Sequence, residues 1–184
     1  MTTPVDRAGS APTVSAMTHP SPACHCAPSA EQVVDLPAGV QGYVAGFLID
    51  PADGSVLLVR KLRPAWQAGK LNGIGGHIEA GETPAVAMRR EFAEEAGLDV
   101  ADFEHFAYLS FPAGAVWFFR AFAPAAVLAG ASTMTDESIE CWSLTDLSCG
   151  GGPALPNLSW LLPLAAYRSD RYAPIVVRAL ANTC

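Results

Sequence analysis

The chain has 184 residues, enough for one domain of ordinary size, and 51 % of them are hydrophobic, which is enough to build a buried core. Its net charge of −7 makes it a poor candidate for binding duplex nucleic acid through the phosphates. No apolar run reaches the roughly 18 residues of a membrane span, and no apolar segment marks a secretory signal, so we expect a cytoplasmic protein without membrane contacts.

Residues 1–38 differ from the rest of the chain in composition. They are rich in Pro, Ala and Ser and show no hydrophobic periodicity, which predicts a disordered arm. From residue 39 onward apolar segments alternate with turn-forming residues, so we expect residues 39–184 to form one folded domain. The sequence leaves the oligomeric state open, and a homodimer is one option.

Several apolar segments of that domain have the length and composition of β-strands. They are residues 41–50, 55–63, 103–111, 115–123, 137–144 and 174–180. The turn-forming residues 51–54 link the first two segments as a hairpin, and residues 112–114 link the third and fourth in the same way. The glycine-rich residues 71–79 are predicted to be a broken strand or a loop.

Two helices are predicted. The first spans residues 84–96, because Thr83 can cap its start, Pro suits its first turn and Gly97 suits its end. The second spans residues 157–168 despite Pro163. A mixture of strands and two helices predicts an α/β or α+β sandwich.

Three glutamates of the first helix, Glu91, Glu94 and Glu95, fall within about 100° of one another around its axis, while Val86 and Phe92 are expected to face the core. Clustered carboxylates repel each other, but they can bind a hard divalent cation through their oxygens. The alternative is a solvated acidic face in which Arg90 pairs with Glu94. Glycines directly before the helix favour the cation site, because they allow a backbone carbonyl to turn toward the same ion.

The spacing of these residues follows a known motif. Gly76, Glu82, Arg90 and the segment Glu91–Leu98 match every defined position of the Nudix box, GX5EX7REUXEEXGU, where U is a bulky apolar residue. From about residue 41 to its end, the chain therefore resembles the Nudix hydrolases. The resemblance implies an α/β/α sandwich built on a mixed β-sheet. It also implies hydrolysis of a nucleoside diphosphate linked to another group, with Mg²⁺ or Mn²⁺ required.

The resemblance also assigns roles within the box. The implied metal ligands are the carbonyl of Gly75 and the carboxylates of Glu91 and Glu95, with Glu94 assisting. Arg90 is expected to pair with a glutamate of the box and to fix its rotamer. Glu82 is expected to secure the loop by accepting hydrogen bonds, and Gly76 and Gly97 are structural positions of the motif.

Two flanking segments, AGKLNGIGG and DESIECW, are similar to the subgroup that contains the 8-oxo-dGTP hydrolases. By this resemblance Glu137, upstream of Trp142, supplies a further metal ligand or the general base, although it could instead be a turn residue ahead of a strand. Asn72 matches the asparagine that reads the base. Asn157 marks a departure, because the mammalian enzymes have two adjacent aspartates in this region, and an amide both donates and accepts hydrogen bonds.

Lys61 and Arg63 are candidates for phosphate contacts or solvated surface charges. The expected activity is hydrolysis of a small-molecule nucleotide, with a (deoxy)nucleoside triphosphate giving a monophosphate and pyrophosphate. Removal of oxidised nucleotides is one role that this activity could serve. The alternatives are hydrolysis of ADP-ribose or a nucleotide sugar, and a non-catalytic module that senses a nucleotide.

Overall fold

The computed structural model describes residues 27–167 and 174–179. In this part of the chain the strands form one seven-stranded mixed sheet. They are β1 (Gln41–Ile49), β2 (Ser55–Arg60), β3 (Leu71–Asn72), β4 (Glu104–Phe111), β5 (Gly114–Phe122), β6 (Ile139–Ser143) and β7 (Ile175–Arg178). The helices are α1 (Pro84–Ala96), α2 (Ala125–Leu128), α3 (Leu144–Ser148) and α4 (Leu158–Ala166).

The sheet has the strand order β3-β2-β1-β5-β4-β7, and β6 pairs with β2. The predicted hairpin of β4 and β5 is confirmed, since these strands pair antiparallel. The predicted pairing of β1 and β2 is present at only one position, Ile49 with Val56. The main partner of β1 is β5, which runs parallel to it over its full length. This fits the nearly continuous burial of β1, because parallel strands lie in sheets that are covered on both faces.

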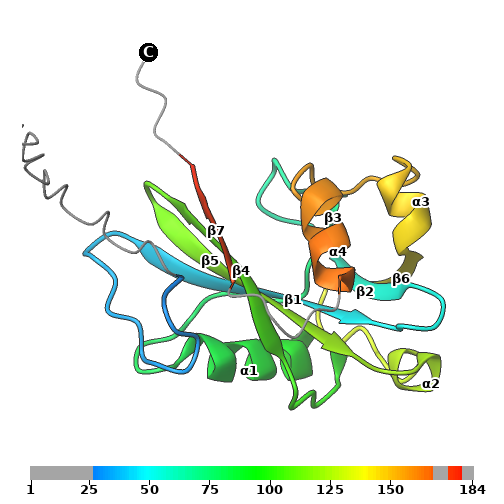
Figure 1. Cartoon of the computed structure of the whole chain (residues 1–184), viewed down its shortest axis with the longest axis horizontal. Helices are drawn as coiled ribbons and strands as arrows, with labels where there is room; N and C mark the ends of the chain where they lie inside the picture. The colour runs from blue at the N-terminus through cyan, green and yellow to red at the C-terminus, as the bar shows by residue number, and fades with distance from the viewer. Residues whose placement is uncertain (1–26, 168–173, 180–184) are drawn as a thin grey trace, which may run out of the picture.

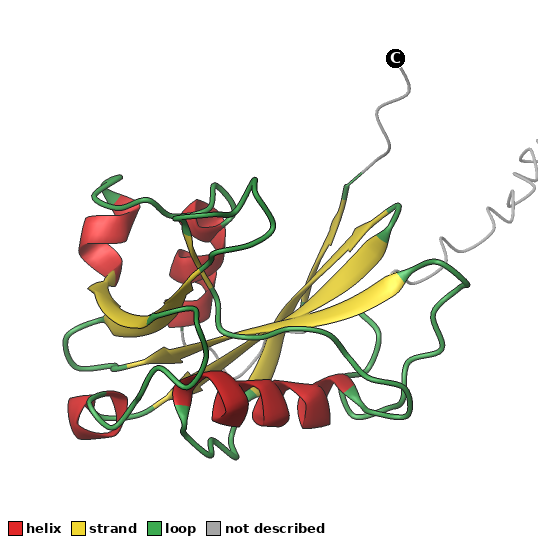
Figure 2. Cartoon of the chain, turned by 180° about the vertical axis from the view of Figure 1, so that it is seen from behind, coloured by secondary structure: helices red, strands yellow, loops and turns green. Residues whose placement is uncertain are grey.

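Helices cover both faces of the sheet, with α1 on one side and α3 and α4 on the other (Figure 1). Met88 and Phe92 of α1 pack with Trp117 in one core, and Leu161 of α4 packs with Phe47 in the other. Figure 2 shows the same layers from behind. The predicted α/β/α sandwich on a mixed sheet is therefore confirmed. The prediction missed α2 and α3, which are too short to produce a helical hydrophobic period.

The boundaries of α1 agree with the prediction. The Thr83 hydroxyl accepts a hydrogen bond from the Val86 amide at 3.2 Å, and Gly97 ends the helix in a left-handed conformation with φ 67°. Phe92 is buried as expected, but the expectation for Val86 was wrong, because its side chain is 53 % exposed. Ala87 and Met88 occupy the buried face instead, and Val86 lies outside the stripe that they form with Phe92.

The described structure includes the last part of the predicted arm. Ala30 is only 7 % exposed, and its carbonyl accepts a hydrogen bond from the Ala85 amide in the first turn of α1 at 3.0 Å. Val34 and Leu36 pack against the same core. Residues 1–26 lie outside the described residues. Among the described helices, none has both the length and the apolar character needed to cross a membrane.

Candidate functional site

The loop before α1 runs alongside β1 as an extension of β3. Ile74 exchanges two backbone hydrogen bonds with Gly46, at 2.7 and 3.1 Å, and the Gly76 carbonyl accepts one from the Val44 amide at 2.9 Å. Between them Gly75 has a φ of 148°, and a Cβ atom at this position would lie 2.3 Å from the Val44 carbonyl oxygen. Only glycine fits this path, which holds the loop backbone between β1 and the glutamates of α1.

Two of the predicted ligands touch this loop directly. The Gly75 amide donates a hydrogen bond to Glu95 Oε2 at 3.2 Å. A Cβ atom on Gly76 would lie 2.6 Å from both carboxylate oxygens of Glu91, so this carboxylate fills the space that a side chain would take. The structure thus places Glu91 and Glu95 of α1 against the backbone of Gly75 and Gly76.

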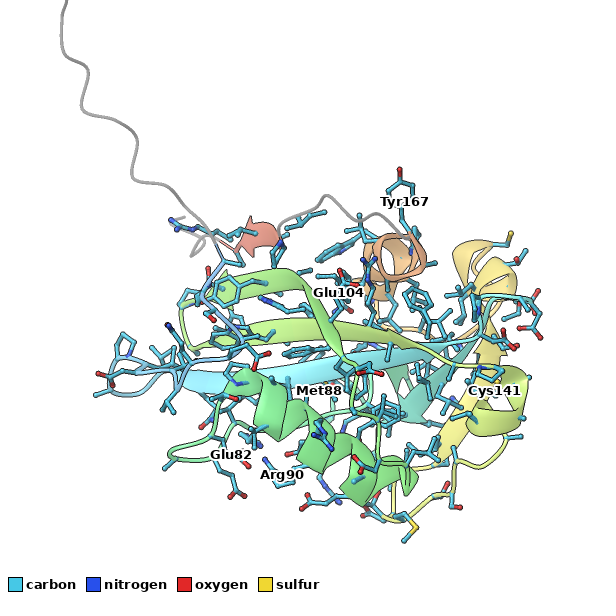
Figure 3. The ribbon with its side chains drawn as sticks, turned by 60° about the horizontal axis from the view of Figure 1, so that its bottom comes forward. Glu82, Met88, Arg90, Glu104, Cys141 and Tyr167 are labelled. Carbon is cyan, nitrogen blue, oxygen red and sulfur yellow. The ribbon has the colours of Figure 1, made fainter. Side chains whose placement is uncertain are left out.

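Arg90 is bonded to three glutamates of the box. Its guanidinium donates to both oxygens of Glu82 at 2.8 and 2.9 Å, to Glu91 at 2.9 Å and to Glu94 at 3.2 Å, and it also reaches the His77 carbonyl at 3.0 Å. Figure 3 shows Arg90 and Glu82 close together beside α1. The Arg90 guanidinium lowers the pKa of Glu82 below its ordinary value. Arg90 therefore links the loop, through Glu82 and the His77 carbonyl, to Glu91 and Glu94 of α1.

Glu137 reaches the site from the segment before β6 and is only 5 % exposed. Its carboxylate accepts hydrogen bonds from the Lys61 ammonium, from the Leu62 amide at 2.6 Å and from the Arg63 amide at 3.3 Å. Burial alone would raise the pKa of Glu137, but Lys61 and the two amides outweigh it, and the pKa lies below its ordinary value. Glu137 is therefore a buried, charged carboxylate.

Glu95 shares the electrostatic environment of these groups. Burial raises the pKa of Glu95 to about 7. The positive charge of Lys61 and the hydrogen bond from Gly75 lower this pKa, but by less than burial raises it. Repulsion from Glu91 and Glu137 adds to the rise. Carboxylates from α1 and from the segment before β6 thus act on one another across the site, although they are far apart in sequence.

The donor set suits a hard divalent cation, which prefers oxygen ligands and would relieve the repulsion among Glu91, Glu95 and Glu137. In the conformations of the described residues, however, no three Asp, Glu, His or Cys side chains converge to form a metal site. Two of these glutamates are instead held by cations of the chain itself, Glu91 by Arg90 and Glu137 by Lys61. Glu94 lies at the outer edge of the group with its side chain 59 % exposed.

The predicted substrate contacts lie around the end of β3. Asn72 Oδ1 accepts the Gly73 amide at 2.9 Å, and its Nδ2 donates to Gln67 Oε1 at 3.4 Å. Asn157 is the N-cap residue of α4 and makes no side-chain capping bond there. The segment just before it pairs with Leu71, through Pro153 and Leu155 at 2.8 and 3.0 Å, which brings the start of α4 toward β3.

Lys61 and Arg63, the residues predicted to contact phosphate, form ion pairs with Glu137 and Asp136. Arg63 is exposed and donates to both oxygens of Asp136, at 2.6 and 2.8 Å. Lys61 is directed to Glu137. The sequence did not indicate these ion pairs or the contact of Gln67 with Asn72, because no motif contains them and the partners meet only through the fold.

The family model for the NUDIX domain matches residues 40–150, which is more than half of the chain. A putative 8-oxo-dGTP diphosphatase 2 of Mycobacterium tuberculosis is 48 % identical over 59 residues, 32 % of this chain and 40 % of that protein. An oxidized purine nucleoside triphosphate hydrolase of Danio rerio is 53 % identical over 47 residues, 26 % of this chain and 30 % of that protein. The chain therefore aligns with less than half the length of these relatives.

Solved structures share the fold at low sequence identity. A MutT protein from Bacillus halodurans has a TM-score of 0.55 at 18 % identity, covering 76 % of this chain and 90 % of that one. The NUDIX domain of Shewanella oneidensis NrtR, solved with ADP ribose, has a TM-score of 0.55 at 18 % identity, covering 71 % and 88 %. Taken with the box and the family match, these results show that the chain belongs to the Nudix family.

Proposed function

We propose that this protein is a metal-dependent pyrophosphohydrolase that cleaves a nucleoside diphosphate linkage. The observation that carries the proposal is the contact of the Gly75–Gly76 backbone with Glu91 and Glu95, in a chain that retains every box carboxylate. The substrate that we propose is a (deoxy)nucleoside triphosphate, with a monophosphate and pyrophosphate as products. The names of the Mycobacterium tuberculosis and Danio rerio relatives support an oxidised purine nucleotide as this substrate.

Nudix enzymes generally use divalent cations, and we propose Mg²⁺ here, with Mn²⁺ as a substitute. The residues that would hold the cation are Glu91, Glu95, Glu137 and the carbonyl of Gly75, with Glu94 in support. When bound, such a cation neutralises charge on the diphosphate and lowers the pKa of bound water.

The remaining residues of the box position these groups. Arg90 bonds to Glu82 of the loop and to Glu91 of α1. Glu91 is therefore already oriented before substrate binds, and no entropy is lost in ordering it during the reaction. A carboxylate of the cluster would take the proton of the attacking water. Glu137 already accepts three hydrogen bonds from described residues and Glu95 accepts one, so Glu95 is better placed for this step.

A second candidate is hydrolysis of ADP-ribose or a nucleotide sugar. The similar fold of the NrtR domain, solved with ADP ribose, supports it. In that case the same carboxylates would act on a diphosphate flanked by two sugars. A non-catalytic nucleotide sensor would bind the same compounds without hydrolysing them.

The test is product release from a panel of compounds, measured with Mg²⁺ and with Mn²⁺. The panel contains the common (d)NTPs, 8-oxo-dGTP, ADP-ribose, a nucleotide sugar and NADH. The wild-type protein is compared with Glu95→Gln, which removes the charge but keeps the size of the side chain and an oxygen that can accept from the Gly75 amide. We expect pyrophosphate from one preferred triphosphate and a loss of about 100-fold or more in kcat for the variant. Binding without turnover by the wild-type protein would favour the sensor, and wild-type rates in a folded variant would contradict the site.

A further inference from the structure

Lys61 follows β2 directly and points into the carboxylate cluster. Its backbone is fixed on both sides, because its amide donates to the Lys70 carbonyl at 2.9 Å and its carbonyl accepts the Gly69 amide at 2.8 Å. Its side chain is only 16 % exposed, and its ammonium bonds to Glu137, whose side chain is 6 % exposed. The loop therefore holds the charge of Lys61 inside the candidate metal site.

A buried carboxylate needs a partner, because removing its charge from water without compensation is strongly unfavourable. The Leu62 and Arg63 amides supply two hydrogen bonds to Glu137, but Lys61 supplies the only positive charge bonded to it among the described residues. Lys61 also acts on Glu95 from a distance, since its charge opposes the rise in the pKa of that residue. Lys61 thus bonds to one proposed metal ligand and acts on the charge of a second through space.

We propose that Lys61 is the resident counter-ion of the metal site: it holds Glu137 in place in the metal-free protein and weakens divalent-cation binding by charge repulsion. The proposal rests on the proposed function only in that Glu95 and Glu137 belong to the metal site. Lys61 is then a positioning residue that acts through Glu137. Two opposite consequences follow from its removal, a less stable metal-free protein and a tighter divalent-cation complex.

The experiment compares the wild-type protein with Lys61→Met, which keeps a long apolar side chain but removes the charge. Lys70→Met is the matched control, since the Lys70 ammonium donates to the neutral Trp66 carbonyl at 2.9 Å. Lys61→Arg restores the charge. Thermal unfolding is measured in EDTA and in Mg²⁺, and the Kd for Mn²⁺ is measured by titration calorimetry without nucleotide.

We expect Lys61→Met to unfold at a lower temperature in EDTA, to gain more stability from Mg²⁺ and to bind Mn²⁺ about 10-fold more tightly. Folding of this variant only in the presence of Mg²⁺ would support the same role. Lys70→Met and Lys61→Arg should behave like the wild type. An unchanged or weaker Mn²⁺ affinity in Lys61→Met would overturn the proposed role of Lys61 but leave the proposed metal site standing. Absence of Mn²⁺ binding by the wild type would overturn the metal site as well.

Discussion

Gly75 and Gly76 are neighbours in sequence but have different surroundings. A Cβ atom on Gly75 would meet the backbone of β1, which cannot move aside, and the φ of 148° is rarely adopted by other residues. The atoms nearest to a Cβ atom on Gly76 would be the two carboxylate oxygens and the carboxylate carbon of Glu91, at the end of a side chain rather than in the backbone. Gly75 is therefore required by the path of the backbone, whereas Gly76 leaves the space that the Glu91 carboxylate occupies.

This difference predicts separate effects of two matched substitutions. Gly75→Ala should lower the free energy of unfolding by about 1–3 kcal/mol or more, because it combines backbone strain with a clash. Gly76→Ala should change stability much less but reduce kcat/KM by about 10–100-fold, because it displaces Glu91. Chemical denaturation and steady-state kinetics measure the two effects. Equal losses of stability in both variants would show that Glu91 is not free to move.

Asn72 is the residue with the clearest predicted role in substrate choice. Its side chain is oriented by the Gly73 amide and by Gln67. Asn72→Ala should change the ratio of kcat/KM between nucleotides that differ only in the base, by about 10-fold, since it removes the proposed base contact. Kinetics with dGTP and 8-oxo-dGTP measure this ratio. A uniform loss for both compounds would mean that Asn72 only shapes the loop.

At the scale of elements, an ion pair joins β2, β6 and the loop that follows β2. Arg60 donates to both oxygens of Glu140, at 2.5 and 2.7 Å, and to the Gly69 carbonyl at 2.9 Å. Trp142 adds a hydrogen bond to Glu140 at 2.9 Å. The pair thereby fixes the loop that directs Lys61 to Glu137, since Lys61 directly follows Arg60.

The pair predicts a pH dependence of stability. The Arg60 hydrogen bonds lower the pKa of Glu140 from 4.5 to about 2, so its ionised form is stabilised by folding. This stabilisation is present above pH 4.5 and is lost as the pH falls toward about 2. Glu140→Gln should therefore cost about 1–3 kcal/mol near neutral pH and progressively less below pH 4.5. Denaturation of both proteins across this pH range measures the difference, and a deficit independent of pH would rule out the ion pair as its source.

At the scale of the whole molecule, residues 30–36 precede the matched family domain but pack against the core that α1 covers. Ala30 packs there and bonds to the first turn of α1, and Leu36 packs close to Gly42 and Ile78. Ile78 belongs to the loop of the Nudix box. The segment before the family domain therefore supports the element that carries the candidate site.

A pair of substitutions tests this support. Ala30→Glu should destabilise the fold by about 2 kcal/mol or more, because it buries a charge without a partner. Val33→Glu is the control, since Val33 is 59 % exposed and should tolerate the change. Thermal unfolding distinguishes the two variants. Similar melting temperatures for both would show that the segment does not contribute to the fold.

The sequence by itself determined the helix of the site and the identity of the family. Thr83 and Gly97 act on atoms only a few residues away, so the ends of α1 followed from local chemistry. The spacing of Glu91 and Glu95 on one helix placed them on one face before any fold was known. The strand segments were predictable for the same reason, since composition and alternation are local properties.

Only the tertiary structure decided which of these elements and charges meet. β1 pairs with β5 along its full length because the sheet is buried on both faces. The turn at residues 51–54 joins β1 to β2, but it does not determine this pairing. The contact of Lys61 with Glu137 joins residues 76 positions apart, and no local pattern records it. The exposure of Val86 and the burial of Ala30 were also set by what packs against α1. Local chemistry fixes the elements, whereas long-range packing selects the partners of each charged group in the site.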